Sequence, residues 1–171
     1  MIVRPASKSD LPLILGIYND AVLNTTATWN ETPVDLANRK VWFEAWRAAG
    51  FPVLVADDNG SVAGYSSFGD FRPFEGYRMT IEHSLYVAAD ARRKGLGTAL
   101  LNALIEEARK LGKRAMIGGI DGSNAPSISL HARFGFAEVG RLSGVGVKFG
   151  RPLDLVLLQK MLQPEKNGRV S

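Results

Sequence analysis

The sequence predicts an α/β domain built on one mixed, mostly antiparallel sheet, and three observations carry this prediction. Residues 57–60 read Asp-Asp-Asn-Gly between two apolar segments, a typical hairpin turn that favours antiparallel pairing in the first half. Residues 79–120 hold a strand, an amphipathic helix and another strand, a succession that favours one parallel pair. The length of 171 residues, 46% of them hydrophobic, fits a single domain with a sizeable core.

The first half is expected to run strand, helix, helix, strand, strand, strand. Ser7 can cap the first helix, with Asp10 three residues later as in a capping box and apolar residues at helical spacing behind it. Thr32 is expected to cap the second helix, with Pro33 in its first turn and Gly50 at its end. The strands of this half are expected at residues 2–4, 52–56, 61–69 and 79–87.

The second half is expected to run helix, strand, helix, strand, strand. A helix starts at Leu96 and carries an apolar residue at every third or fourth position, and Asn124 caps a shorter helix that Gly135 ends. We therefore predict one domain over residues 1–162 and a loose C-terminal tail over residues 163–171. The strands of this half are expected at residues 115–120, 136–147 and 153–161.

Charge and composition narrow the function classes. The chain has 21 Lys and Arg against 17 Asp and Glu, and this net charge of +4 is spread along the sequence, which argues against a nucleic-acid partner. No apolar run approaches the ~20 residues of a membrane span, and residues 1–5 are not typical of a signal peptide, so we expect no membrane partner and a cytoplasmic location. With no cysteine and two histidines, neither a disulfide nor a metal centre is expected.

The sharpest local pattern is Arg-Arg-Lys-Gly-Leu-Gly-Thr at residues 92–98, which joins a strand to a helix. Glycines let a ligand approach the backbone closely, and a helix N-terminus presents free N–H groups and a positive dipole end. With three cations in front, the segment is a candidate pyrophosphate site; the alternative is a surface turn with a basic rim. It lacks the spacing of a P-loop, and Leu100 stands where a dinucleotide fingerprint needs its third glycine.

The spacing Arg-x-x-Gly-x-Gly at residues 92–97 resembles the acetyl-CoA loop of the GNAT family of N-acetyltransferases. Residues 124–127 and 130–136 are similar to a second half-motif of that family, and the order of elements resembles its fold. Residues 81–87, Ile-Glu-His-Ser-Leu-Tyr-Val, are similar to the phosphinothricin N-acetyltransferase branch, which includes enzymes acting on methionine sulfone and methionine sulfoximine. The resemblance implies one domain with helices on both faces of its sheet.

The resemblance also implies an activity. We expect acetyl-CoA as co-substrate, and as acceptor the α-amino group of a small amino acid analogue such as methionine sulfone, methionine sulfoximine or phosphinothricin. A homodimer is implied as well. Two other functions stay open: acetylation of a protein or peptide N-terminus, and binding of CoA as a sensor without catalysis.

The resemblance further assigns residues to the cofactor. Its pantetheine arm is expected to pair like an extra strand with the end of the strand at residues 85–87, its pyrophosphate to bind the backbone N–H groups of residues 93–98, and Asn124 to contact the arm. The expected cofactor-binding residues are Leu85, Tyr86, Val87, Arg92, Arg93, Lys94, Gly95, Leu96, Gly97, Thr98, Asn124 and Ser127.

Glu82 is the candidate general base. An amine must be neutral before it attacks a thioester, and a carboxylate can take its proton directly or through water. Strand alternation puts Thr80, Glu82, Ser84 and Tyr86 on one face of the sheet unless a bulge intervenes. The alternative is a solvated or ion-paired strand glutamate.

The two histidines are weaker candidates. His83 falls on the opposite face from Glu82, where we expect a packed or hydrogen-bonded side chain. His131 stands where many members of the family carry a tyrosine that protonates the departing thiolate. A thiol with a pKa of about 8.5 leaves without much help, so the existence of a general acid stays open.

The loop before the Glu82 strand is the candidate substrate site. Arg72 can form a forked pair with a substrate carboxylate, and Glu75 can hold an α-ammonium or close the loop. The alternative is an ordinary exposed loop. The polar segment at residues 28–31 is a candidate far wall of the same cleft, because loops there flank the cleft in the resembled family. The expected substrate-binding residues are Arg72, Phe74, Glu75, Gly76, Tyr77 and Trp29.

Overall fold

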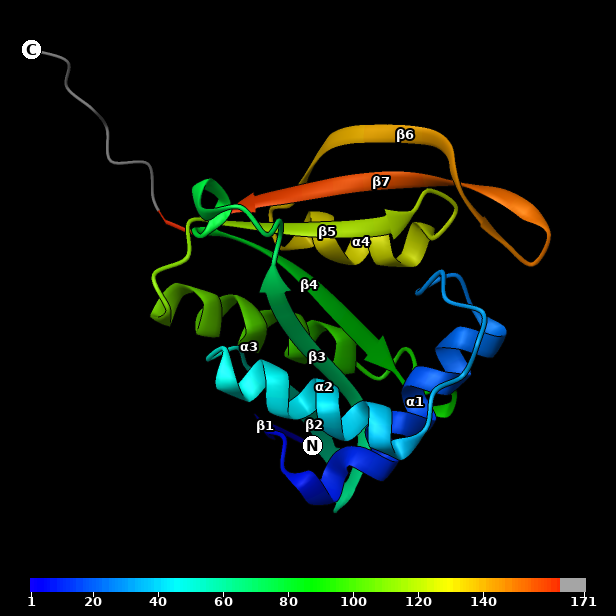
Figure 1. Ribbon diagram of the computed structural model, residues 1–171, viewed down its shortest axis with the longest axis vertical. Coiled ribbons are helices and arrows are strands. Elements are labelled where there is room, and N and C mark those ends of the chain that lie inside the picture. The colour runs from blue at the N-terminus through cyan, green and yellow to red at the C-terminus, as the bar shows by residue number, and fades with distance from the viewer. Residues whose placement is uncertain (164–171) are drawn as a thin grey trace, which may run out of the picture.

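The computed structural model describes residues 1–163 and contains a seven-stranded sheet in the order β1-β2-β3-β4-β5-β7-β6 (Figure 1). Within these residues, neighbouring strands are antiparallel except β4 and β5, which are parallel. The mixed sheet with one parallel pair is therefore confirmed. The strands are β1 (Ile2–Pro5), β2 (Val53–Asp58), β3 (Ser61–Asp70), β4 (Thr80–Val87), β5 (Ala115–Asp121), β6 (Ala137–Lys148) and β7 (Arg151–Met161).

Helices cover both faces of this sheet, as expected. Ile14 of the first helix packs with Val55 and Tyr65 on one face, whereas Leu100 and Leu104 of the third helix belong to the cluster on the other face. None of the helices in the described residues is both long and apolar enough to cross a membrane. The helices are α1 (Leu11–Asn24), α2 (Leu36–Ala48), α3 (Leu96–Lys110) and α4 (Ala125–Arg133), with 3-10 turns η1 (Lys8–Asp10), η2 (Glu75–Tyr77) and η3 (Ala89–Ala91).

The start of α2 corrects the sequence prediction. The helix begins three residues later than expected, and Asp35, not Thr32, is its N-cap, with a carboxylate that accepts from the N–H of Asn38 at 2.8 Å. The cause is a contact from α1: Asn19 donates to the carbonyl of Val34 at 2.8 Å and accepts from its N–H at 3.0 Å. This pair of hydrogen bonds occupies the Val34 backbone groups, so the helix can only start beyond it.

The predicted C-terminal tail at residues 163–171 lies, apart from Gln163, outside the described residues. Immediately before it, Leu162 is buried in the core and its N–H donates to the carbonyl of Arg114 at 2.9 Å.

The strands β4 and β5 are paired over only three residues each. Their parallel register joins residues 80–82 to residues 115–117, after which β4 continues beside β3 and β5 continues beside β7. Figure 1 shows the two strands starting together and parting towards their C-terminal ends. The register between β3 and β4 is unbroken, so the strand alternation expected around Glu82 holds.

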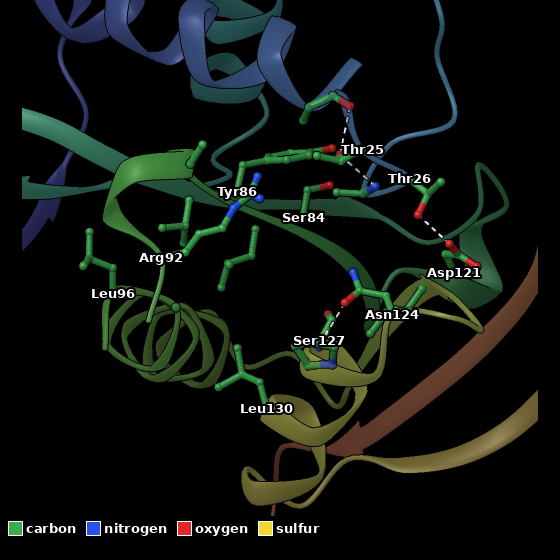
Figure 2. Close-up of a pocket in the computed structure, with 18 of the residues that line it drawn as sticks. Thr25, Thr26, Ser84, Tyr86, Arg92, Leu96, Asp121, Asn124, Ser127 and Leu130 are labelled. Atoms are coloured by element: carbon green, nitrogen blue, oxygen red, sulfur yellow. Dashed lines mark hydrogen bonds between the residues drawn. The ribbon is translucent and has the colours of Figure 1, made fainter. Parts of the chain in front are cut away.

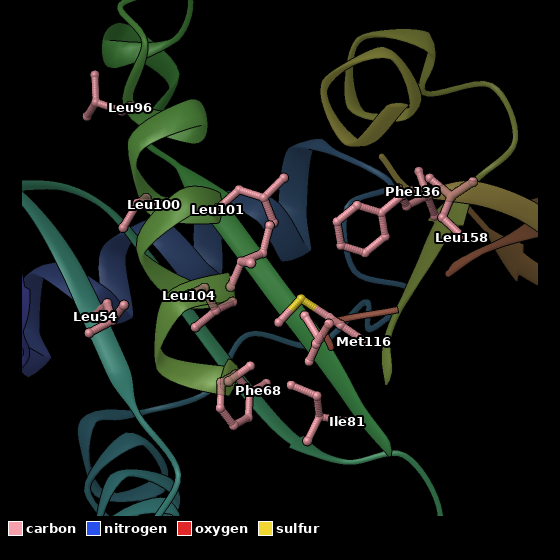
Figure 3. Close-up of a cluster of buried hydrophobic side chains, with 14 of the residues drawn as sticks. Leu54, Phe68, Ile81, Leu96, Leu100, Leu101, Leu104, Met116, Phe136 and Leu158 are labelled. Carbon is pink, nitrogen blue, oxygen red and sulfur yellow. The ribbon is translucent and has the colours of Figure 1, made fainter. Parts of the chain in front are cut away.

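The larger hydrophobic cluster lies under α3 and holds these strands. Leu100, Leu101 and Leu104 of α3 are fully buried against Ile81 of β4 and Met116 of β5 (Figure 3). Because Ile81 and Met116 are register partners, their packing under α3 fixes the point from which the two strands diverge.

Candidate active site

A cavity of about 1440 Å³ lies at the opening between β4 and β5 (Figure 2). Its walls come from the C-terminal half of β4, the end of β5, the start of α3, the helix α4 and the C-terminal end of α1. The volume exceeds the ~300–1,000 Å³ of most small-molecule pockets, so a long ligand fits. The C-terminal ends of parallel strands are also where open α/β sheets usually bind ligands.

The structure brings the residues assigned to the cofactor together in this cavity. All of them line it except Lys94, which is exposed in the loop before α3. Beyond residue 82, the edge of β4 that faces β5 has no strand partner in the described residues. Its backbone groups are therefore free to pair with an extended ligand, as an added strand would.

The loop before α3 is shaped to present backbone N–H groups. Arg93 has a φ of 62° and Gly95 a φ of 83°, both in the left-handed region, and Gly95 is the N-cap of α3. A side chain at Gly95 would have open space but a strained backbone. The first turn of α3 then leaves its N–H groups and its positive dipole end at the cavity, which suits an anion.

Gly97 has a packing role in addition to its place at the cavity. A Cβ at this position would lie 3.3 Å from a methyl group of Leu130 and 3.8 Å from one of Leu85, so its side of the helix is already covered. Gly97 therefore lets α3 approach α4 and β4 closely, while its backbone also lines the cavity.

The cavity is rimmed with positive charge. Arg92, Arg93, Arg133 and Arg151 line it from three different parts of the chain. Arg92 makes a long ion pair of 3.8 Å with Asp20, and both side chains are substantially exposed. A cationic rim next to the N-terminus of α3 fits a ligand that carries phosphate groups.

Asn124 joins the cap of α4 to the cavity wall. Its Oδ1 accepts from the N–H of Ser127 at 3.2 Å, which makes it the N-cap, and Pro126 stands in the first turn as expected. Figure 2 shows the amide of Asn124 pointing into the cavity beside Ser127.

Glu82 lies where β4 and β5 begin to part. A Cβ on Gly119 would be 3.2 Å from Oε1 of Glu82, so the carboxylate packs over a bare stretch of β5. Burial raises the pKa of Glu82, and the positive charge of Arg72 opposes this rise. Glu82 is not itself among the cavity-lining residues, although Ser84 and Gly119 on either side of it are.

His83 lies on the opposite face, as expected, and its contact with His131 was not anticipated. Its Nδ1 is 2.9 Å from the carbonyl oxygen of Ile117, and its Nε2 is 2.8 Å from Nε2 of His131. Burial, followed by repulsion from His131, lowers the pKa of His83 to about 3, and burial also lowers the pKa of His131. Both rings line the cavity.

The expected substrate residues lie outside the cavity. The loop after β3 contains η2, and its side chains Phe74 and Tyr77 are 70% and 44% exposed. Arg72 stacks on the ring of Phe71 at 4.6 Å and is the charge that acts on Glu82. The loop thus reaches the proposed base, but none of its expected residues lines the cavity.

Trp29 is separated from that loop and rests on the β6–β7 hairpin. Its ring occupies the space in which Gly146 would carry a side chain. Below it, the buried Lys148 donates to the carbonyls of Ala21, Thr25 and Thr28 at 3.3, 2.6 and 2.6 Å. The hairpin therefore holds the segment that follows α1, and Trp29 takes part in this support.

A hydrogen bond between Thr26 and Asp121 bridges the open end of the cavity (Figure 2). Asp121 is the last residue of β5, and it also accepts from the N–H and hydroxyl of Ser123 at 3.0 and 2.8 Å. Sequence reasoning did not select either residue, because 95 positions separate them. The one available signal was a carboxylate at the end of an apolar strand.

A metal centre has no support in the described part of the chain, which contains no group of three or more His, Asp or Glu side chains suited to a metal ion.

Three relatives allow the geometry to be compared with known proteins. The L-methionine sulfoximine/L-methionine sulfone acetyltransferase of Pseudomonas aeruginosa is 57% identical over 97% of this chain and 97% of its own. The crystal structure of a GNAT superfamily phosphinothricin acetyltransferase from Sinorhizobium meliloti, in complex with acetyl-CoA, is 38% identical with a TM-score of 0.91, covering 97% of this chain and 94% of that one. A ribosomal-protein-alanine N-acetyltransferase from Brucella melitensis is 55% identical with a TM-score of 0.93, over 94% of this chain and 99% of that one.

The family model for the acetyltransferase (GNAT) family matches residues 14–136 of the sequence. This segment runs from α1 through α4 and so includes both parting strands and the loop before α3. With its fold, its cavity and its relatives in agreement, the chain belongs to the acetyltransferase (GNAT) family and is an N-acetyltransferase.

Proposed function

We propose that this enzyme transfers the acetyl group of acetyl-CoA to the α-amino group of a small amino acid analogue, such as methionine sulfone, methionine sulfoximine or phosphinothricin. The observation that carries the proposal is the convergence of the expected cofactor residues on the cavity between β4 and β5. The names of the Pseudomonas aeruginosa and Sinorhizobium meliloti relatives support the choice of acceptor.

The chain offers each part of acetyl-CoA a suitable partner. The first turn of α3 and the arginines of the rim would hold its phosphates, and the free edge of β4 with the amide of Asn124 would hold its pantetheine arm. Acetyl-CoA supplies an activated thioester, and the protein has to bring an unprotonated amine against it.

Glu82 is the residue we propose to accept the proton of the substrate ammonium. It lies on the α1 and α2 side of the sheet at the start of the opening, with its carboxylate over Gly119. Because burial raises its pKa, it is a better proton acceptor than an exposed glutamate. A water molecule can carry the proton where contact is not direct.

Arg72 is the residue we propose to bind the substrate carboxylate. It is close enough to Glu82 to act on its pKa, so a carboxylate paired with the guanidinium would bring the neighbouring amine towards the base. Tetrahedral sulfone, sulfoximine or phosphinate ends would need hydrogen-bond donors that plain methionine would leave unpaired.

A panel of amino acids and analogues tests this function. The purified enzyme is incubated with acetyl-CoA and each compound, and release of the CoA thiol is measured. Methionine sulfone and methionine sulfoximine should be consumed with a much higher kcat/KM than methionine. Equal rates for all compounds, or none, would contradict the proposed acceptor.

Acetylation of a protein N-terminus is the second candidate, and the name of the Brucella melitensis relative favours it. The same assay with a short peptide that begins with alanine separates the two. A kcat/KM for the peptide above that for methionine sulfone would favour the second candidate.

We also propose a homodimer in the cytoplasm, where acetyl-CoA is available. Strand β6 forms one edge of the sheet, and its apolar side chains Val139, Leu142, Val145 and Val147 are exposed. A second copy of the chain could cover this apolar surface, whose exposure to water is unfavourable. Light scattering at micromolar concentration should give twice the mass of one chain. V145K should lower the measured mass towards that of one chain. A monomer mass for the unaltered protein would count against the dimer.

A further inference from the structure

Lys148, the last residue of β6, is fully buried with 0% of its surface exposed, although lysine is rarely found inside a protein. Its Nζ donates to the carbonyl of Ala21 at 3.3 Å and to the carbonyls of Thr25 and Thr28 at 2.6 Å each. A carbonyl oxygen only accepts, so three of them require three hydrogens on the nitrogen. An ammonium carries three, whereas a neutral amine carries two.

The surroundings of this nitrogen favour the charged form. Burial lowers the pKa of Lys148, and the negative charge of Glu31 opposes this effect. Ala21 belongs to the last turn of α1, where the carbonyl groups form the negative end of the helix dipole. Lys148 is therefore a cation that closes the C-terminal end of α1 from another part of the chain.

The turn that follows Lys148 makes a second contact with the same region. Phe149 and Gly150 connect β6 to β7, and the N–H of Phe149 donates to a carboxylate oxygen of Glu31 at 2.9 Å. Phe149 and Arg151 line the cavity, whereas Lys148 does not. The end of the hairpin is thus attached to the residues that follow α1, and it forms part of the cavity wall beside them.

Residues 25–28, called here the α1 extension, are also fastened on the far side of the cavity. Thr25, Thr26 and Ala27 line the cavity, and the hydroxyl of Thr26 donates to Asp121 at the end of β5. In Figure 2, Thr25 and Thr26 lie across the cavity from Asn124. A ligand arm along the free edge of β4 would therefore have the start of α4 on one side and the α1 extension on the other.

We propose that Lys148 is a positioning residue for acetyl-CoA, which it acts on by holding the α1 extension against the cavity. This inference rests on the proposed binding of acetyl-CoA between β4 and β5. Without the ammonium, three carbonyls would lose their common donor, and unpaired carbonyls are stable only where water reaches them. The α1 extension would then move away from the cavity and from Asp121, and the wall beside the pantetheine arm would open.

Lys148→Met tests this role, because methionine keeps most of the length of the side chain and removes its charge. Binding of CoA is measured by calorimetry at a temperature at which circular dichroism shows both proteins folded. We expect the Kd for CoA to rise about 10-fold, as it does when only one molecule in ten has the binding conformation. A purely structural role would lower the melting temperature and leave this Kd unchanged, which would overturn the proposal.

Lys113→Met is the matched control. The Nζ of Lys113 also donates to a backbone carbonyl, that of Arg78 at 2.7 Å, but Lys113 does not line the cavity and does not contact the α1 extension. The Kd for CoA should be the same in this variant as in the wild type. An equal rise in both variants would show that loss of any such lysine weakens binding, and would overturn the proposal.

Thr26→Val tests the same wall with Lys148 intact, and it remains decisive if Lys148→Met does not fold. Valine keeps the size of the side chain and removes the hydroxyl that reaches Asp121. The Kd for CoA should rise here too, and the double variant should lose less than the two single variants together, because both act on the same extension. An unchanged Kd for Thr26→Val, or full additivity, would overturn the proposal.

Steady-state kinetics separate this inference from the proposed function. In Lys148→Met and Thr26→Val, the KM for acetyl-CoA should rise by a larger factor than kcat falls, because Glu82 and the loop after β3 are unaltered. A wild type that binds CoA but does not acetylate methionine sulfone would refute the proposed acceptor and leave the role of Lys148 intact. An active wild type whose two variants keep the normal KM for acetyl-CoA would refute the role of Lys148 alone.

Discussion

The carboxylate of Glu82 lies beside Gly119, two residues beyond the last pair of β4 and β5, and a Cβ on Gly119 would be only 3.2 Å from Oε1 of Glu82. The same Cβ would also lie 3.3 Å from a methyl group of Leu155. Gly119 thus determines where the carboxylate of the proposed base lies, although nothing in its sequence context distinguishes it from other strand glycines.

Replacing Gly119 by Ala should therefore move the carboxylate by a few tenths of an ångström. We expect kcat to fall up to about 10-fold, since a 1 Å displacement of a catalytic group costs roughly 10²-fold. The control is Gly16→Ala on α1, where a Cβ meets nothing within 4 Å and activity should be unchanged. Equal kcat for both variants would show that the position of the carboxylate is not limited by Gly119.

Glu82→Gln should keep the shape of the side chain and remove its basicity. We expect kcat to fall by about 10²–10⁴-fold with little change in the affinity for acetyl-CoA, measured by steady-state kinetics and by calorimetry. In the wild type, kcat/KM should fall as the pH drops through the raised pKa of Glu82, because the base becomes protonated. Near-full activity of Glu82→Gln at every pH would assign proton removal to another group or to solvent.

The same variant has an expected effect on stability. A carboxyl whose pKa is raised by folding binds its proton more tightly in the native state, so its contribution is favourable at low pH and is lost as the pH rises through the folded pKa. Glu82→Gln should therefore melt at a higher temperature than the wild type at pH 7, and this advantage should vanish below the unfolded pKa. An unchanged difference between the two proteins at all pH values would argue against the raised pKa.

The start of α2 gives a prediction about stability alone. Asp35→Ala removes the N-cap and should lower the free energy of unfolding by about 1 kcal/mol, which is roughly 2–4 °C in melting temperature for a chain of this size. Thr32→Ala is the matched control and should have almost no effect, because Thr32 lies outside the helix. A larger loss for Thr32→Ala would instead support the cap that the sequence favours.

Local signals account for most of what the sequence predicted correctly. The turn at Asn59 and Gly60 has φ values of 56° and 87°, the left-handed pair that the Asn-Gly sequence favours between hairpin strands. The cap at Asn124 and the capping box between Ser7 and Asp10 likewise depend on residues within four positions of each other, although the box lies at the 3-10 turn η1 and Asp10, not Ser7, is the N-cap of α1. Alternation along β4 also placed Glu82 and His83 on opposite faces, since no bulge intervened.

Contacts between distant residues could not be predicted in the same way. The start of α2 is set by Asn19 on another helix, the contact between His83 and His131 joins residues 48 positions apart, and Lys148 reaches carbonyls at the end of α1. Each depends on side-chain direction after the elements have packed, which neither spacing nor propensity contains. The expected substrate loop shows the same limit. Its Arg72 is close enough to Glu82 to act on the pKa of that carboxyl, but the expected substrate residues of the loop lie outside the cavity.

Arg72 provides the sharpest test of substrate choice, because two of its proposed effects can be separated. Its charge opposes the rise of the Glu82 pKa, and its guanidinium can form a forked pair with a substrate carboxylate. Arg72→Ala should lower kcat/KM for methionine sulfone by roughly 2–4 kcal/mol of transition-state stabilisation, and the acidic limb of the pH profile should move to higher pH.

Arg72→Lys separates the two effects, because it keeps the charge and loses the fork. We expect it to leave the acidic limb near its wild-type position while still lowering kcat/KM for methionine sulfone. For an amine that resembles methionine sulfone but lacks the carboxylate, both variants should lower kcat/KM much less than they do for the amino acid. The reason is that this amine has no carboxylate to pair with the side chain of residue 72. If both compounds lose equally, Arg72 supports the loop or the base and does not bind the carboxylate, and substrate choice must then depend on other residues around Glu82.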